Sequence, residues 1–146
     1  MNTGTQTRKA LLWATLATVT TLVLGCSTMG GYGGSKVTLS GTEEVPPVAT
    51  SASGSGTIVI GADKSVTGSV TTTGVAAVAA HIHVGAAGKN GPVIVPLKKS
   101  GDNVWMVPEG SKLTDAQYAS YKAGDLYVNV HSAAHKGGEI RGQLKP

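Results

Sequence analysis

Phenylalanine is absent from the 146-residue chain, and Phe, Trp and Tyr together make up only 4% of it. A hydrophobic core therefore has to be built from Val, Ile, Leu and Ala, supplemented by Trp105 and a few tyrosines. The length allows one domain and a short additional segment. A domain of about 110 residues buries roughly two-thirds of its unfolded surface, which is adequate for a core of small aliphatic side chains.

Cysteine occurs once, as Cys26. A single thiol forms no intrachain disulfide, and if it is modified no thiolate remains to bind a metal ion. The domain must then be held together by its core alone.

Charged residues are scarce as well, at 14% of the chain, and the net charge is +4. Removal of residues 1–25, which contain Arg8 and Lys9, leaves ten basic and eight acidic side chains and a net charge of +2. This balance excludes the strongly basic surface that is typical of nucleic-acid-binding proteins.

The apolar run at the front of the chain, residues 10–24, is too short to span a membrane, which takes about 20 residues. Arg8 and Lys9 precede the run and Gly25 follows it, which is the pattern of a secretory signal peptide. Its end, Leu22-Val23-Leu24-Gly25-Cys26, resembles a bacterial lipoprotein signal that is cut before the cysteine. We expect residues 1–25 to be a lipoprotein signal peptide and Cys26 to carry lipid, with a free or buried thiol as the alternative.

Residues 26–35 are rich in Gly and Ser and predict a flexible tether. A lipidated Cys26 would make the membrane the first partner of the protein. The expected location is therefore the bacterial cell envelope, on its periplasmic side or at the cell surface.

Residues 36–146 predict an all-β domain. Short alternating segments separated by Gly, Ser and Asn favour an antiparallel β-sandwich, Greek-key-like, with about 7–9 strands. One short helix is expected over 114–123, where Thr114 and Gln117 have the spacing of a capping box. The pairs Glu43-Glu44 and Lys98-Lys99 are interpreted as solvated loop and hairpin residues.

Three of the expected strands carry polar side chains on one face and aliphatic ones on the other, because side chains alternate with period two. These strands cover 80–84, 126–131 and 138–144. Their polar residues are His81 and His83, then Tyr127, Asn129 and His131, and finally Glu139, Arg141 and Gln143. We expect the first two strands to meet in space.

The first interpretation of this polar face is a metal site. Imidazole suits copper and zinc. His81 and His83 lie two apart on one strand and can both reach one ion, with His131 as a third ligand and His135 as a candidate fourth. Asn129 or Glu139 would then fix the tautomer of a ligand ring.

The second interpretation is a structural polar network. The histidines would bond to Glu139, Asn129 and the backbone, and Arg141 would pair with Glu139. Tyr127 and Gln143 belong to the same face. The sequence leaves both interpretations open.

A family resemblance links these segments. The motifs that carry it are His81-Ile82-His83, 88–97, Leu113-Thr114, 124–131 and Gly138-Glu139-Ile140-Arg141-Gly142-Gln143-Leu144. In this order they resemble the CHRD domain, which implies an extracytoplasmic all-β module over roughly residues 36–144 without a defined activity.

We therefore expect a lipid-anchored binding or structural module that is not an enzyme. The alternative is a copper or zinc protein that stores or delivers the ion, or a dismutase-type redox enzyme. No other cofactor is predicted, and the sequence identifies no protein or small-molecule partner.

Overall fold

The computed structural model describes residues 1, 3 and 33–146. The expected signal peptide, Cys26 and most of the tether lie outside the described residues. The elements in chain order are β1 (Ser35–Ser40), η1 (Gly41–Glu43), β2 (Ser53–Ile60), β3 (Val66–Thr73), β4 (Ala77–Val84), β5 (Val93–Pro96), β6 (Lys98–Lys99), β7 (Val104–Met106), α1 (Asp115–Lys122), β8 (Leu126–Ser132) and β9 (Ile140–Leu144).

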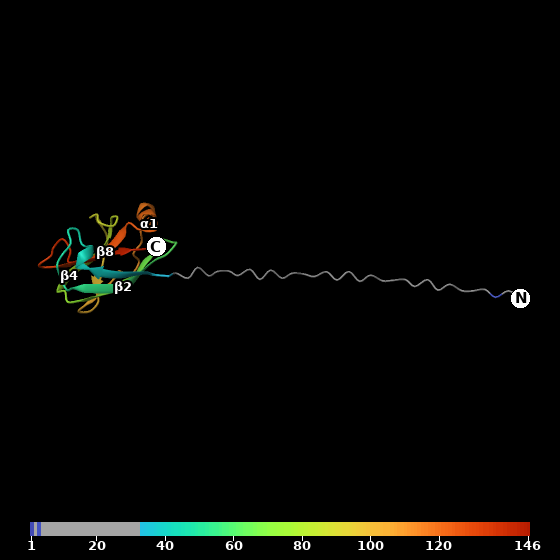
Figure 1. Ribbon diagram of the computed structural model, residues 1–146, viewed down its shortest axis with the longest axis horizontal. Coiled ribbons are helices and arrows are strands. Elements are labelled where there is room, and N and C mark those ends of the chain that lie inside the picture. Colours follow the sequence, from blue (N-terminus) through green and yellow to red (C-terminus); the bar gives the residue numbers. More distant parts are fainter. Residues whose placement is uncertain (2, 4–32) are drawn as a thin grey trace.

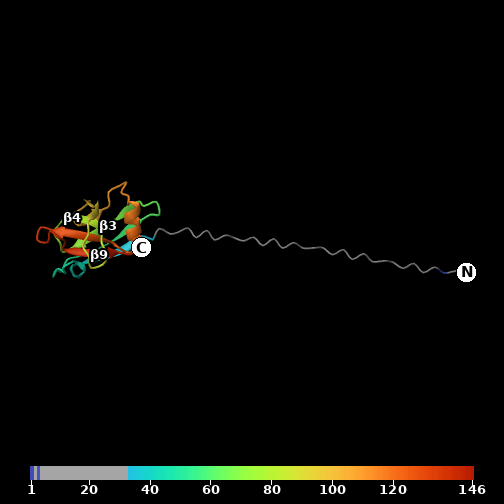
Figure 2. The same ribbon diagram turned by 90° about the horizontal axis from the view of Figure 1, so that it is seen from above.

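The nine strands form one antiparallel sheet in the order β5-β4-β8-β9-β1-β2-β3-β7-β6. The sheet curls until its ends nearly meet, because the two outermost strands, β5 and β6, are separated only by Leu97. The Leu97 N–H donates to the Ala80 carbonyl of β4 at 2.9 Å. The expected antiparallel all-β fold is confirmed, and its layers are parts of one curled sheet (Figures 1 and 2).

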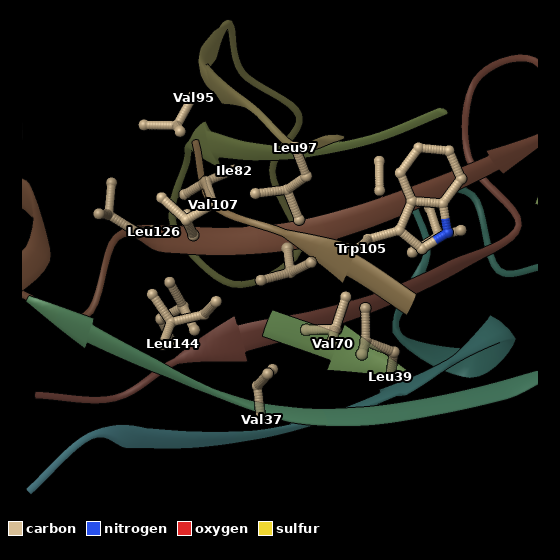
Figure 3. Packing of buried hydrophobic residues seen from close by; sticks show 14 of the residues in the cluster. Val37, Leu39, Val70, Ile82, Val95, Leu97, Trp105, Val107, Leu126 and Leu144 are labelled. Atoms are coloured by element: carbon tan, nitrogen blue, oxygen red, sulfur yellow. The ribbon is translucent and has the colours of Figure 1, made fainter. Parts of the chain in front are cut away.

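The core fills the inside of this curled sheet. Figure 3 shows aliphatic side chains from several strands pointing into one interior. Its labelled members include Val37, Leu39, Val70, Ile82, Val95, Trp105, Leu126 and Leu144, all of them buried. With no phenylalanine in the chain, Trp105 is the largest apolar side chain of the core, as the composition predicts.

The alternation expected for the histidine strands is confirmed. On β4, Ala80 and Ile82 point inward with exposed fractions of 1% and 0%. On β8, Leu126, Val128 and Val130 are each 0% exposed. The polar residues of both strands therefore lie on the outer face of the sheet.

The helix begins where its capping box predicts. Thr114 Oγ1 accepts from the Gln117 N–H at 3.2 Å, and Gln117 Oε1 accepts from the Thr114 N–H at 2.8 Å. Figure 1 shows α1 at one end of the sheet. Among the described residues, no helix has the length and apolar character to span a membrane.

One strand was not expected. Lys98 and Lys99 form β6 and pair with Met106 and Trp105 of β7. Both lysines are exposed, as predicted, because a strand at the edge of a sheet can keep its side chains in solvent while its backbone is paired.

Ile82→Ala should lower the free energy of unfolding by about 2–5 kcal/mol, because it leaves a cavity in a core position with no exposed surface. Val78→Ala on the same strand removes a side chain that is 62% exposed, and should cost less than about 1 kcal/mol. Urea unfolding of both variants measures the difference. Equal losses would contradict the assignment of the inner face of β4.

Candidate metal centre

The antiparallel pairing of β4 with β8 brings together histidines that are 50 residues apart in sequence. In this register Ala79 lies opposite His131, His81 opposite Asn129, and His83 opposite Tyr127. His131 is therefore diagonal to His81 on the outer face. Because diagonal neighbours in a sheet are within reach of long side chains, the register allows the rings to meet.

The three rings do converge. His81 Nδ1 lies 3.0 Å from His131 Nε2. One potential ligand atom from each of His81, His83 and His131 lies within 4.8 Å of the other two. The metal-ligand group found among the described residues consists of these three histidines, and the expected candidate fourth ligand, His135, is not part of it.

Backbone carbonyls fix the tautomers of two rings. The Gly91 carbonyl lies 2.9 Å from His83 Nδ1, and the Lys136 carbonyl lies 2.9 Å from His131 Nδ1. A carbonyl oxygen only accepts, so both Nδ1 atoms carry the proton. Both Nε2 atoms of the neutral rings are therefore unprotonated and carry a lone pair. This is the arrangement by which proteins orient metal-binding histidines.

The two lone pairs have different surroundings. His131 Nε2 accepts a hydrogen bond from His81 Nδ1, which an ion could replace once the His81 proton has moved to its Nε2 atom. His83 Nε2 is buried and has no hydrogen-bond partner among residues 33–146. Asn129 Oδ1 and Trp105 Nε1 are also buried without a partner, but of these three atoms only His83 Nε2 belongs to the histidine group, where its lone pair is available to a ligand.

Burial lowers the pKa of all three imidazoles below the ordinary value of 6.5. For His81 the neighbouring His131 and His83 lower the pKa further. For His83 and His131 the hydrogen bonds to carbonyls partly oppose the effect. The rings are therefore neutral at pH 7, which is the form that binds a metal ion.

Tyr127 supports His83 from the neighbouring strand. The two rings are stacked, with centroids 4.8 Å apart and planes 10° from parallel. The Arg141 guanidinium also lies against the Tyr127 ring, 3.4 Å from its centroid. The Tyr127 hydroxyl accepts from the Gly91 N–H at 3.1 Å, and so holds the residue whose carbonyl orients His83.

Arg141 is 1% exposed and binds the loop between β4 and β5. Its guanidinium donates to the carbonyls of Ala86 and Lys89 at 3.2 and 2.9 Å and to Asn90 Oδ1 at 3.3 Å. The expected pairing of Arg141 with Glu139 is wrong. Glu139 instead accepts a hydrogen bond from the Thr50 hydroxyl at 2.9 Å.

Glu44 is the charged residue of this face that sequence reasoning missed. The interpretation of Glu43-Glu44 as a solvated pair holds for Glu43, but Glu44 is only 5% exposed and accepts a hydrogen bond from Asn129 Nδ2. Burial raises the Glu44 pKa to about 7, although the Arg141 charge and the Asn129 hydrogen bond both act to lower it.

The comparison with known proteins rests on one finding. The model of the CHRD domain family matches residues 35–144. The chain belongs to the CHRD domain family. Membership indicates a binding or structural module. No curated protein and no solved structure matches the chain.

Two further residues of the predicted site, Gln143 and His135, make structural contacts in the CHRD domain. Gln143 Nε2 donates to the carbonyls of Gly85 and Gly124 at 2.9 and 2.7 Å, which ties β9 to two loops. His135 caps a turn through its backbone, where its carbonyl accepts from the Gly138 N–H at 3.1 Å. The imidazole cluster and the Arg141–Glu44 network thus lie side by side on one face of the domain.

The sequence indicates the buried position of Glu44 only indirectly, through the glycine at position 138, far along the chain. Gly138 adopts φ +135°, and a Cβ atom there would lie 2.6 Å from Glu44 Oε1. The glycine is required because the carboxylate from a loop 94 positions earlier packs directly on it. Spacing within one strand does not predict such a contact.

Glu44→Gln should change how the stability of the CHRD domain depends on pH. Glu44 ionises near pH 4.5 in the unfolded chain and near pH 7 in the folded protein. The contribution of protonated Glu44 to the unfolding free energy is therefore complete below about pH 4.5 and is lost as the pH rises through about 7. Glutamine keeps an acceptor and never ionises. The unfolding free energy of the variant should therefore rise relative to the wild type across this range.

Urea unfolding at several pH values between 4.5 and 8 measures this difference. The histidines, whose pKa values are lowered, give an opposite slope below pH 6.5, but it is common to both proteins and cancels. Glu43→Gln is the matched control at the exposed neighbouring position and should follow the wild-type profile. Parallel profiles for Glu44→Gln and the wild type would contradict the raised pKa.

Proposed function

We propose that the CHRD domain binds a copper or zinc ion through His81, His83 and His131. The observation that carries the proposal is His83 Nε2, a buried lone pair without a partner among the described residues, whose ring is oriented by the Gly91 carbonyl. One ring nitrogen from each of His81, His83 and His131 lies within 4.8 Å of the other two. A buried acceptor at the meeting point of three neutral imidazoles is suited to a metal ion.

The ligand set favours copper or zinc over other ions. Both are bound by imidazole nitrogen, whereas magnesium and calcium require oxygen ligands. Metal–nitrogen bonds of 2.0–2.1 Å place the nitrogen atoms of a tetrahedral site about 3.4 Å apart. The His81–His131 separation of 3.0 Å is already close to this value. The widest separation of up to 4.8 Å needs side-chain rotations, which the half-exposed His81 and His131 can make.

The structural network accounts for most polar contacts of this face but not for His83 Nε2. Arg141, Gln143 and Asn129 each contact a loop or a buried carboxylate. None of these contacts involves His83 Nε2. A purely structural role would leave that atom with the cost of an unsatisfied buried group, about 1–3 kcal/mol.

We propose binding, as in storage or delivery of the ion, and not turnover. A dismutase-type enzyme would need a redox-active copper in addition to the three nitrogen ligands. The family gives no activity of that kind to build on. The site residues supply ligands and a fixed geometry, which are sufficient for binding.

Alanine at any one of the three ligand positions should weaken binding of Cu²⁺ or Zn²⁺ by at least about 100-fold. Loss of a residue that only supports a ligand costs 10–100-fold, and loss of a ligand costs more. Isothermal titration with each ion, in competition with a chelator of known affinity, gives the dissociation constants. His135→Ala is the matched control and should stay within about twofold of the wild type.

A pH series provides a second check of this prediction. The three pKa values lie below 6.5, so the affinity should be nearly constant from pH 7.5 to 6.5 and fall at lower pH as up to three protons compete with the ion. Metal affinity that does not change with pH, or that His83→Ala leaves intact, would contradict the site.

We further propose that lipid on Cys26 anchors the domain to the bacterial cell envelope. The support comes from the order Arg8-Lys9, the apolar run 10–24 and Gly25-Cys26. Two or three acyl chains on one cysteine hold a protein stably on a membrane. The ion would then be bound close to the membrane surface.

The full chain expressed in a bacterium should yield a mature protein that begins at Cys26 and carries a diacylglyceryl group, detectable by intact mass spectrometry of the membrane fraction. Cys26→Ser should lose the lipid mass and retain residues 1–25, because processing follows modification. Ser27→Ala is the control and should be lipidated. An unmodified Cys26 in the wild-type protein would rule out the anchor.

A further inference from the structure

A pocket of about 390 Å³ lies beside the imidazole cluster. His81 and His131 form part of its wall, and both are half-buried. The wall also contains Val78, Ala79, Ala133 and Lys136. The third histidine, His83, does not line the pocket and is buried, with 8% of its surface exposed.

In this arrangement, an ion bound by the three histidines would be accessible to a further ligand from the side of the pocket. His83 would hold the ion from the buried side, and His81 and His131 would hold it from the sides that border the pocket. Copper and zinc take at least four ligands in most of their sites, and three protein ligands leave one position for water or another molecule. Because His81 and His131 line the pocket, a fourth ligand on such an ion would have room on the side of the pocket.

The charge around the fourth position favours an anion. Three neutral imidazoles leave the charge of a divalent ion without compensation, and Lys136 adds a positive charge in the wall. Among the residues that line the pocket there is no carboxylate. Glu139 and Glu44 belong to the same face of the sheet but do not line the pocket; they bind Thr50 and Asn129.

The remainder of the wall favours an apolar group attached to that anion. Val78 is 62% exposed and lines the pocket at the point where a register shift between Ala77 and Ala79 interrupts the pairing of β4 with β8, so its side chain is free to contact a ligand. Ala79 and Ala133 add small apolar surfaces. A volume of about 390 Å³ is at the lower end of the range for small-molecule sites, about 300–1,000 Å³.

We propose that the pocket binds a small monocarboxylate with a short apolar body, whose carboxylate takes the fourth position on the metal ion. Lys136 attracts the same carboxylate, and Val78 and Ala133 contact the apolar body. The inference rests on the proposed metal site, since the ion supplies most of the attraction for the anion. It assigns the bound ion a co-ligand of defined chemistry.

The test uses the full chain with zinc bound, benzoate as the probe and benzamide as its neutral isostere. Benzoate should bind the zinc-loaded protein at least ten times more tightly than the zinc-free protein or than benzamide binds either form. Lys136→Met should weaken benzoate binding about fivefold, the size of one exposed ion pair. Val78→Ser should weaken benzoate more than acetate, because only benzoate reaches the apolar wall.

Zinc affinity is measured first, so failure of the metal site and failure of the pocket are distinguished. Neither Lys136→Met nor Val78→Ser removes a ligand, so both should still bind zinc, Val78→Ser as the wild type does and Lys136→Met at least as tightly, because it removes a positive charge near the ion. Zinc binding without an effect of benzoate, or equal benzoate binding with and without zinc, would overturn the pocket and leave the metal site standing. Benzoate that strips zinc from the protein would also overturn it. Absence of zinc binding would overturn both.

Discussion

The register between β4 and β8 is the constraint on which the core and the candidate site both depend. Ile82 lies opposite Val128, and both side chains are fully buried in the core. The same alignment places His81 and His131 on the outer face, diagonal to each other. A slip of one residue would turn every side chain of a strand to the opposite face and would place imidazoles among aliphatic side chains. The hydrophobic core therefore fixes the position of the histidines.

The outer face of these strands is unusual because it is largely covered. Arg141 binds carbonyls of the loop between β4 and β5, and Asn129 binds Glu44 from the segment that follows η1. Burial removes Glu44 from solvent and raises its pKa to about 7, although the Arg141 charge and the Asn129 hydrogen bond lower it. The hydrogen bonds of Arg141 to Ala86 and Lys89 hold the loop that contains Gly91, whose carbonyl orients His83. The charged network thus acts as a scaffold for one ring of the cluster.

The parts of the structure that depend on local pattern could be predicted from the sequence. Alternation of His81 and His83 with Ile82 gave the faces of β4, and the spacing of Thr114 and Gln117 gave the start of α1. The convergence of the histidines also followed, because two strands with the same type of polar face are natural partners in an antiparallel sheet. Such inferences need only the period of the strand and the chemistry of the side chains.

Contacts made by loops could not be predicted in this way. Glu44 meets Asn129 across 85 positions of sequence, and Arg141 meets Lys89 across 52. A periodic sequence pattern does not predict such pairs, because the position of a loop side chain depends on how the whole sheet closes. The expected pair of Arg141 and Glu139 looked reasonable because the residues are two apart on one strand, yet each finds a better partner on a loop. The Lys98–Lys99 strand was missed for a related reason, since its pairing depends on where β7 returns.

The state of His83 links stability to binding. A buried acceptor without a partner costs about 1–3 kcal/mol, and the fold carries this cost while Gly91 and Tyr127 keep the ring in place. An ion at Nε2 would remove the cost and would bind only the folded chain with high affinity, because the three rings are brought together by the β4–β8 register. Binding must then stabilise the fold by mass action, by about 2.7 kcal/mol at an ion concentration one hundred times the dissociation constant. The unpartnered His83 Nε2 is therefore a local cost of the fold that the proposed ion would remove, and this links the strand register to the chemistry of the site.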